Sequence, residues 1–288
     1  MFAVCFFNII YDINEATSHD SIVQLLIQNT MFLLFFLLLS FIIKKNRLTQ
    51  SNSYALFLFC CFILMIPFLF KDSSLAFSFF FLLLALRRIL SISSQKNSEK
   101  KILDASIWIT IAALFYFWSI LFFIILFIAI IQLASTNYKL IFIPFVGFTS
   151  VFILTSVYHT IVNNGVWKFL EYKDQISFDF SPYNSLKLII PAIFILLSGI
   201  LAFIYKSITI SKTPLKEKPK HWILFFFLLI GIILIILKNN KNGSELIFLL
   251  APISIFTANF IESIDKKWIS ELFLWFVLML PFALFFMI

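Results

Sequence analysis

The stretch ASIWITIAALFYFWSILFFIILFIAIIQL, residues 105–133, decides how this chain folds. It runs for 29 residues without a charged side chain. As one α-helix it would extend ~43 Å at a rise of ~1.5 Å per residue. A hydrocarbon layer is only ~30 Å thick, so a single crossing would require a tilt near ~45°. The alternative is two shorter arms that turn near residues 116–119 and return to the same side of a membrane.

The composition of the whole chain is that of a membrane protein. Of the 288 residues, 62% are hydrophobic and 12% are charged, against about a quarter charged in soluble domains. Apolar runs of about 15–30 residues alternate with short polar connectors, as a bilayer requires. The runs lack the alternation of β-barrel strands, and helices satisfy their own backbone groups in lipid. The expected spans are 22–43, 54–70, 74–90, the long run 105–133, 140–162, 186–205, 222–237, 246–260 and 270–288.

The distribution of basic residues favours two arms over one tilted helix. Residues 1–23 contain three acids and no Lys or Arg, which places the N-terminus outside. A hairpin then puts 16 of the 22 basic residues inside and 6 outside, whereas a single crossing divides them 13 to 9. The positive-inside rule selects the hairpin, although its turn contains neither Gly nor Pro.

We therefore predict an all-α fold, a polytopic transmembrane helical bundle of about eight crossings plus one re-entrant or broken helical hairpin. Residues 1–288 form a single transmembrane domain with no soluble domain, and both termini lie outside. The longest external loop is 163–185, in which we expect a helix lying in the membrane interface. Two of the later spans, 222–237 and 246–260, are short and must draw in flanking residues or lie in locally thin bilayer.

Six short segments carry a resemblance to a known family: Asn46-Arg-Leu, Ser53-Tyr54, Leu84-Ala-Leu-Arg-Arg-Ile89, Lys101-Ile-Leu-Asp-Ala-Ser106, Ala113-Leu-Phe-Tyr-Phe-Trp-Ser119 and Ile143-Pro-Phe-Val-Gly147. With them, residues 46–158 resemble a family of uncharacterised multi-pass inner-membrane proteins common in Bacteroidota. The resemblance implies a location in the cell inner membrane and implies no activity. Members of that family usually begin with one more apolar helix, so we expect residues 1–10 to be the remnant of a first helix or an interfacial foot.

Candidate catalytic residues are few. The sequence contains no nucleophile elbow, no zinc-binding H-E-x-x-H and no phosphate-binding glycine loop, and we expect no cofactor, no metal and no nucleic-acid partner. Asp12 and Glu15 are the acidic pair with the best case for chemistry. Membrane glycosyltransferases that use polyprenyl-phosphate sugars place an acidic residue in their first outer loop, as a base or a metal ligand. The alternative is a solvated acidic loop.

Three residues are candidates for lipid or phosphate contact. Arg87 and Arg88 end the third expected span, and Trp167 lies in the external loop. Paired guanidinium groups could hold a phosphate headgroup, or could simply reach the interface and stop the span. Asp104, directly before the long apolar run, is expected to cap the helix that begins there.

The leading function hypothesis is a non-catalytic component of a cell-envelope assembly or secretion complex. Such a component would contact membrane lipids and other membrane protein subunits. The hypothesis rests on the lack of a convergent polar site and on a Phe-rich, Gly-poor helix surface. The alternative is a glycosyltransferase-like enzyme that uses a polyprenyl-linked substrate at the outer face, with Asp12 and Glu15 as its catalytic residues. A transporter is the third hypothesis, although no expected span carries a charge near its centre.

Overall fold

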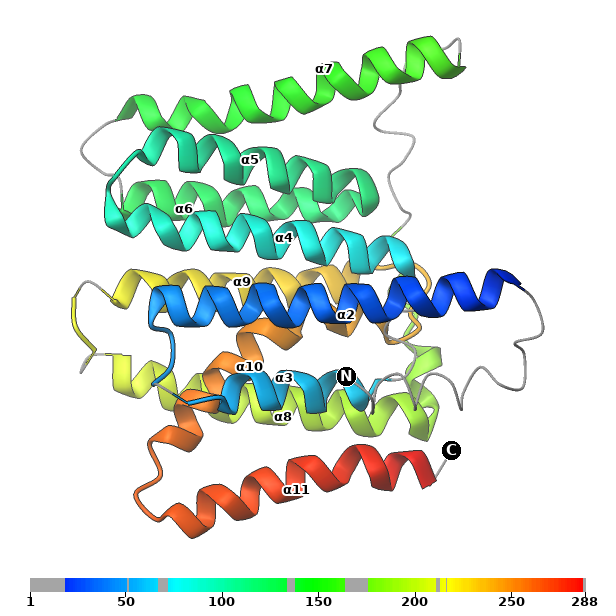
Figure 1. The fold of residues 1–288 in the computed structure, drawn as a ribbon, viewed down its shortest axis with the longest axis vertical. Coiled ribbons are helices and arrows are strands. Elements are labelled where there is room, and N and C mark those ends of the chain that lie inside the picture. The colour runs from blue at the N-terminus through cyan, green and yellow to red at the C-terminus, as the bar shows by residue number, and fades with distance from the viewer. Residues whose placement is uncertain are drawn as a thin grey trace. The chain divides into compact units, whose positions relative to one another are not determined.

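A computed structural model describes residues 19–50, 52–66, 72–133, 138–163, 176–210, 213–215 and 217–286. This part of the chain is helical and contains no β-strand, and seven of its helices are long and apolar enough to cross a membrane (Figure 1). The predicted all-α membrane fold is confirmed. The α-helices are α2 (His19–Asn46), α3 (Tyr54–Leu64), α4 (Ser73–Ser91), α5 (Ser98–Phe115), α6 (Phe123–Leu133), α7 (Ile143–Asn163), α8 (Leu186–Thr209), α9 (Lys218–Leu237), α10 (Ile247–Glu262) and α11 (Lys267–Phe286).

The helices divide into two compact units. Unit 1 comprises residues 1–76, 179–211 and 241–288, and unit 2 comprises residues 77–178 and 212–240. Each unit is described by itself below. Both are built from apolar helices, and one transmembrane domain over the whole chain stays a prediction.

The long apolar run lies in unit 2 and is broken at Tyr116. Helix α5 ends before this residue, whose backbone is extended with φ −142° and ψ 108°. A 3₁₀-helix, η3 (Phe117–Phe122), then leads into α6. The two arms contact each other and lie side by side in Figure 1. The predicted broken hairpin is confirmed, and its turn is at the predicted position.

Side-chain contacts with α4 show how far the hairpin reaches. At its base, Arg88 pairs with Asp104. Near its tip, the rings of Phe77 and Phe115 stack with centroids 5.3 Å apart, so α5 runs antiparallel to α4. The hydroxyl of Ser119 in the tip lies 2.7 Å from that of Ser78. Because Ser78 is only the sixth residue of α4, the tip stops about one and a half turns short of the start of that helix.

Helices α7 and α9 also run antiparallel to α6. Phe123 contacts Phe148 of α7, with ring centroids 6.2 Å apart, and the next turn of α6 contacts the preceding turn of α7. Along α9, Phe122 contacts Phe227 at 4.7 Å, while the Tyr116 hydroxyl donates to the Leu234 carbonyl oxygen at 3.3 Å. The connectors α4–α5 and α6–α7 and the start of α9 therefore lie at one end of unit 2.

This end, which we name the basic end of unit 2, carries eight described cations. They are Arg87, Arg88, Lys96, Lys100, Lys101, Lys139, Lys218 and Lys220. The opposite end contains the hairpin tip and Lys238. The count of basic residues in the sequence predicted this arrangement, in which the connectors before and after a hairpin lie at the same, basic end.

Helix α10 forms the centre of unit 1. It is almost entirely buried and packs against α8 and α3. Helix α8 runs parallel to α10, since Gly199 faces Ile253 and the Tyr205 ring contacts the Phe260 ring at 5.4 Å. A Cβ atom at Gly199 would lie 2.9 Å from the Ile253 side chain, so the absence of a side chain permits this close approach. Helix α11 packs on α3 at the edge of the unit.

Unit 1 has a basic end of its own. There the turn after α2 is fastened to the last turn of α10: Asn259 Nδ2 donates to the Leu48 carbonyl oxygen at 3.1 Å, and the Gln50 N–H donates to the Glu262 carboxylate at 3.1 Å. The described cations at this end are Lys44, Lys45, Arg47, Lys206, Lys266 and Lys267.

The observed helices differ from the expected spans mainly at their ends. Helix α9 begins at Lys218 rather than at residue 222, and the candidate span of α10 covers Ser244–Glu262. Both short spans therefore draw in flanking residues. Helix α3 ends at Leu64, while residues 67–70, the end of the expected span 54–70, lie outside the described residues. The expected interfacial helix falls largely on residues 164–175, which also lie outside them.

Candidate functional site

The structure describes two of the five predicted site residues. Arg87 and Arg88 lie near the C-terminal end of α4, at the basic end of unit 2. Asp12, Glu15 and Trp167 lie outside the described residues. The proposed acidic pair and the proposed tryptophan contact therefore stay predictions.

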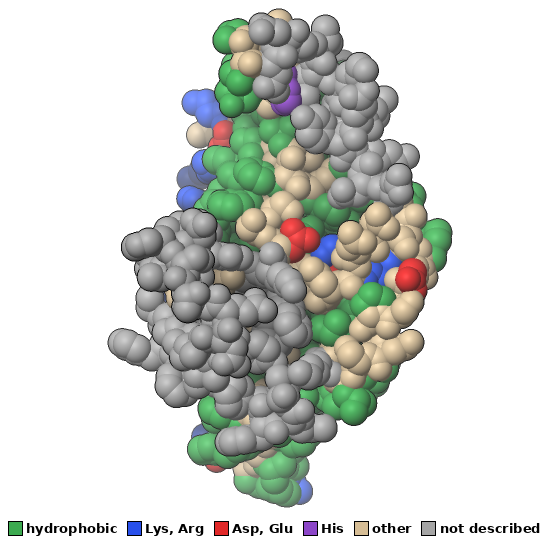
Figure 2. Space-filling view, turned by 90° about the vertical axis from the view of Figure 1, so that its right-hand side faces the viewer, with side chains coloured by type: hydrophobic (Ala, Val, Ile, Leu, Met, Phe, Trp, Pro, Cys, Tyr) green, Lys and Arg blue, Asp and Glu red, His purple; other side chains and the backbone are tan. Residues whose placement is uncertain are grey.

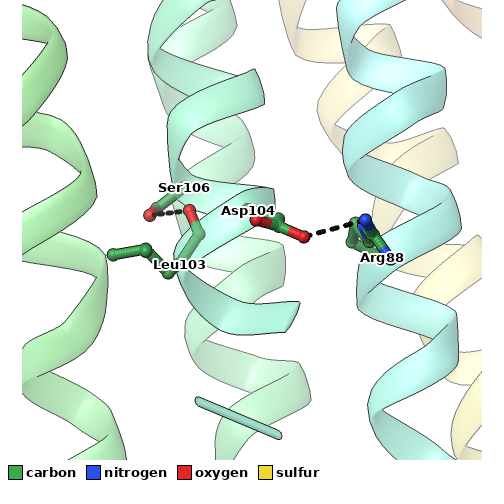
Figure 3. Close-up of polar contacts among 4 residues, drawn as sticks. All are labelled: Arg88, Leu103, Asp104 and Ser106. Carbon is green, nitrogen blue, oxygen red and sulfur yellow. Dashed lines mark hydrogen bonds and ion pairs between the residues drawn. The ribbon is translucent and has the colours of Figure 1, made fainter. Parts of the chain in front are cut away.

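Arg88 forms an ion pair with Asp104 of α5. Its Nη2 atom lies 2.9 Å from Asp104 Oδ2, and the two side chains are 37% and 36% exposed. Figure 3 shows the two side chains pointing toward each other from neighbouring helices. The guanidinium group is thus already neutralised by a carboxylate of its own chain. Contact of Arg87 and Arg88 with a lipid phosphate stays a prediction, but Asp104 would compete with a phosphate for Arg88.

The expected cap at Asp104 is wrong. Helix α5 begins at Ser98, with Asn97 at the N-cap position, so Asp104 lies in the second turn of the helix. The apolar run begins at residue 105, seven residues after the start of the helix. The helix itself continues back through a polar stretch whose side chains point to water and to α4.

Lys101 fastens the connector between α4 and α5. Its Nζ atom donates to the Ser91 carbonyl oxygen at 2.8 Å and to Ser94 Oγ at 2.6 Å. Ser94 ends the 3₁₀-helix η2 (Ile92–Ser94), and Gln95 and Asn97 then adopt positive φ values of 55° and 50°. The ammonium group therefore bridges the two sides of a tight turn.

Ser106 marks the closest approach of α5 to α7. Its hydroxyl donates to the Leu103 carbonyl oxygen at 2.7 Å, as Figure 3 shows. A Cβ atom built on Gly147 of α7 would lie 1.8 Å from Ser106 Oγ and 2.9 Å from Ser106 Cβ. The position must therefore be glycine for these two helices to pack as they do.

Most of the segments that carried the resemblance make contacts between elements. In unit 2, residues 84–89, 101–106 and 143–147 meet through Arg88, Asp104, Ser106 and Gly147. Residues 113–119 form the hairpin tip. In unit 1, Asn46 and Ser53 bracket the turn that is fastened to α10, and the Asn46 side-chain amide donates to the Ile42 carbonyl oxygen at 2.9 Å.

Comparison with known proteins gives one match. A model of a family of unknown function, DUF6427, matches residues 1–288. The chain belongs to this family. No curated protein and no solved structure matches the chain. The match covers the whole chain, whereas the segments quoted above covered residues 46–158.

Sequence reasoning missed a buried polar cluster at the end of unit 1 opposite its basic end. Glu245 is only 1% exposed. The Tyr183 hydroxyl donates to its Oε1 atom at 2.8 Å, and the Asn242 N–H donates to its Oε2 atom at 3.4 Å. Asn242 Oδ1 in turn accepts from the Ser244 N–H at 3.2 Å. These hydrogen bonds of Asn242 and Glu245 enclose Gly243, the N-cap residue of the short helix η8 (Ser244–Leu246), which leads into α10.

The same cluster includes Lys241 and the segment before α8. Lys241 is 3% exposed, and its Nζ atom lies 4.5 Å from the centroid of the Phe180 ring. Hydrogen bonds from the Ser181 hydroxyl and N–H lower the pKa of Asp179, and the Lys241 charge adds to this. Burial and then the Glu245 charge raise the pKa of Tyr183. The spacing Asn-x-x-Glu could have predicted a helix start near residue 244, but no local signal links Tyr183 to Glu245, 62 residues away.

The described residues form no group of three potential metal ligands. A pocket of about 220 Å³ between α3 and α11 is lined by Phe57, Leu274, Trp275 and Leu278, with one carboxylate, that of Glu271. Figure 2 shows hydrophobic side chains over much of the coloured surface, with charged side chains confined to small groups. In the described part of the chain, the polar contacts between helices thus form separate small groups, and they do not converge on an open cleft.

Proposed function

We propose that this chain is a non-catalytic component of a cell-envelope assembly or secretion complex, and that it lies in the inner membrane of a bacterium of the Bacteroidota. One observation carries the proposal. The polar side chains that the described structure brings together are used to hold helices to one another. A residue that is engaged in a closed pair is a poor candidate for binding or transforming a substrate.

Three such contacts support this reading. Arg88 pairs with Asp104, Glu262 accepts from Gln50, and Glu245 accepts from Tyr183. Each joins segments that are separated in the sequence. A buried carboxylate without partners would be costly, and the buried carboxylate of Glu245 accepts from two donors. Their role in stability explains why these residues are present without any catalytic step.

The helix faces at the edges of the units fit an assembly component. Helix α7 contacts α5, and helix α11 contacts α3. In each of the two candidate spans that contain α7 and α11, only 22% of the most apolar 18 residues are buried inside the described structure. Their large exposed side chains include Phe142, Phe145, Leu154, Ile161, Trp268 and Trp275. Helix association in membranes uses packing of such faces. We propose that lipid and the helices of partner subunits share them.

Purification from native membranes tests the proposal. An affinity-tagged chain, extracted in a mild detergent, is expected to co-purify with other membrane subunits in defined proportion. Extraction in a harsh detergent is the control and should release the chain as a monomer. A chain that runs as a lone monomer in every mild detergent would contradict the proposal.

No observation favours the enzyme over the assembly component. An enzyme would need an outward-opening groove where Asp12, Asp72 and Trp167 converge, and Asp12 and Trp167 lie outside the described residues. Asp72 lies directly before α4, where its carboxylate accepts from the Ser74 hydroxyl at 2.8 Å. The enzyme hypothesis keeps its own test: Asp12→Asn should abolish a glycan phenotype while expression is unchanged.

A further inference from the structure

The basic end of unit 2 carries more positive charge than its acids can neutralise. Its eight described cations face three described acids, Glu99, Asp104 and Glu217. Asp104 is already paired with Arg88. The remaining cations therefore produce a strongly positive local potential at this end.

The apolar helices place this charge at the level of lipid headgroups. Arg87 and Arg88 lie in the last turns of the candidate span Ser73–Ser94, and Lys139 begins the candidate span Lys139–Val162. Lys218 begins the candidate span Lys218–Leu237. When the apolar middle of each helix lies in hydrocarbon, these ends lie where phosphate groups are found.

Three of the cations project from connectors that meet on one helix. Lys96 and Lys100 belong to the turn after η2 and the start of α5, and Lys139 belongs to the 3₁₀-helix η4 (Tyr138–Phe142). All three are exposed. Both η2 and η4 contact α6, so the two connectors lie on the same side of unit 2. Lys101, in the first turn of α5, donates to the Ser91 carbonyl oxygen and to Ser94 Oγ.

We propose that the basic end of unit 2 is a docking surface for anionic phospholipid headgroups, which contact Lys96, Lys100 and Lys139. The negative potential of an anionic membrane surface attracts ammonium groups that lie close to it. This attraction falls off within a Debye length of ~8 Å at physiological salt. The headgroup contact then falls on exposed lysines of the connectors, whereas a phosphate at Arg88 would compete with Asp104.

Thermal unfolding of the full chain in detergent, with added phosphatidylglycerol or phosphatidylcholine, tests the proposal. Phosphatidylglycerol is expected to raise the melting temperature and phosphatidylcholine is not, because a ligand that binds only the folded state stabilises it. In the variant Lys96→Gln/Lys100→Gln/Lys139→Gln, the apparent affinity for phosphatidylglycerol should fall at least about tenfold. High salt should reduce the effect in the unaltered protein.

Two controls separate this surface from general charge attraction. The variant with arginine at the same three positions should keep the effect. The variant Lys45→Gln/Lys266→Gln/Lys267→Gln, which alters three exposed lysines at the basic end of unit 1, should keep most of it. Equal losses in the two glutamine variants, an equal response to phosphatidylcholine, or reproduction of the effect by inorganic phosphate alone would overturn the proposal. If the first glutamine variant does not fold, a salt-insensitive response of the unaltered protein would overturn it too.

Discussion

Several charged residues of the described part of this protein have partners in neighbouring elements. Arg88 and Asp104 show this at a helix end, and Glu245 with Tyr183 shows it in a buried cluster. The position of Arg88 at the end of a helix was predictable from the sequence. Its partner was not, because we expected the next helix to begin at residue 105, with Asp104 as its N-cap.

A double-mutant cycle measures the Arg88–Asp104 pair. Both side chains are more than one third exposed, so solvent screening limits their coupling to about 0.2–1 kcal/mol. Arg88→Gln and Asp104→Asn should each lower the free energy of unfolding in detergent, and the double variant should lose less than the two losses combined. Lys100→Gln, at the same end, is the control. Additive losses would mean that the two groups do not interact.

Tyr183→Phe tests the buried cluster. The substitution removes one donor from Glu245, which is 1% exposed, so the free energy of unfolding should fall by about 1–3 kcal/mol. Ser181→Ala, which alters an exposed hydroxyl in the same segment, should have a smaller effect. An unchanged unfolding free energy in Tyr183→Phe would show that the contact does not stabilise the fold.

The raised pKa of Tyr183 adds a prediction about pH. Because folding raises this pKa, the unfolded chain loses the phenolic proton first, at its ordinary pKa of about 10. The stability that neutral Tyr183 contributes is therefore complete below about pH 10 and is lost as the pH rises above it. The difference in unfolding free energy between the unaltered protein and Tyr183→Phe should shrink from about pH 8 to about pH 11. A constant difference would contradict the argument.

At the scale of elements, the sequence predicted the apolar spans but not where their helices begin. The helix α5 extends seven residues before the apolar run, and α9 takes in Lys218, Pro219 and Lys220. Backbone hydrogen bonds continue through these polar residues, and hydropathy does not detect them. The break at Tyr116 was predicted from charge and length, not from turn residues. A single extended residue, anchored by its hydroxyl on Leu234, makes the turn.

The packing of α5 against α7 gives the sharpest element-scale prediction. Gly147→Ala places a methyl group into the space of Ser106, so it should lower the melting temperature and yield by separating the two helices. Adding Ser106→Gly removes the obstructing atoms and should restore part of the loss. Ser150→Ala, in the same helix, removes a hydroxyl that donates only to the Gly147 carbonyl oxygen at 2.8 Å and should be nearly neutral. A neutral Gly147→Ala would show that the helices do not approach so closely.

At the scale of the whole molecule, the sequence indicated the class of fold but not its division into units. Residues 212–240 belong to unit 2, although the segments on either side of them belong to unit 1. Which apolar helix contacts which depends on matching surfaces, such as Gly147 with Ser106 and Gly199 with Ile253. Hydropathy carries no such information. The charge distribution did predict that the connectors before and after the hairpin lie at one end of unit 2.

Accessibility of single cysteines on the two sides of the membrane tests the hairpin most directly. In a background with Cys5, Cys60 and Cys61 replaced, cysteine is placed at Lys96 before the hairpin, at Lys139 after it, or at Asn240 at the opposite end of unit 2, all exposed positions. An impermeant maleimide should label Asn240→Cys in intact cells, and should label Lys96→Cys and Lys139→Cys only after permeabilisation. Labelling of Lys96→Cys and Lys139→Cys from opposite sides would mean that residues 105–133 cross the membrane once, and would contradict the account.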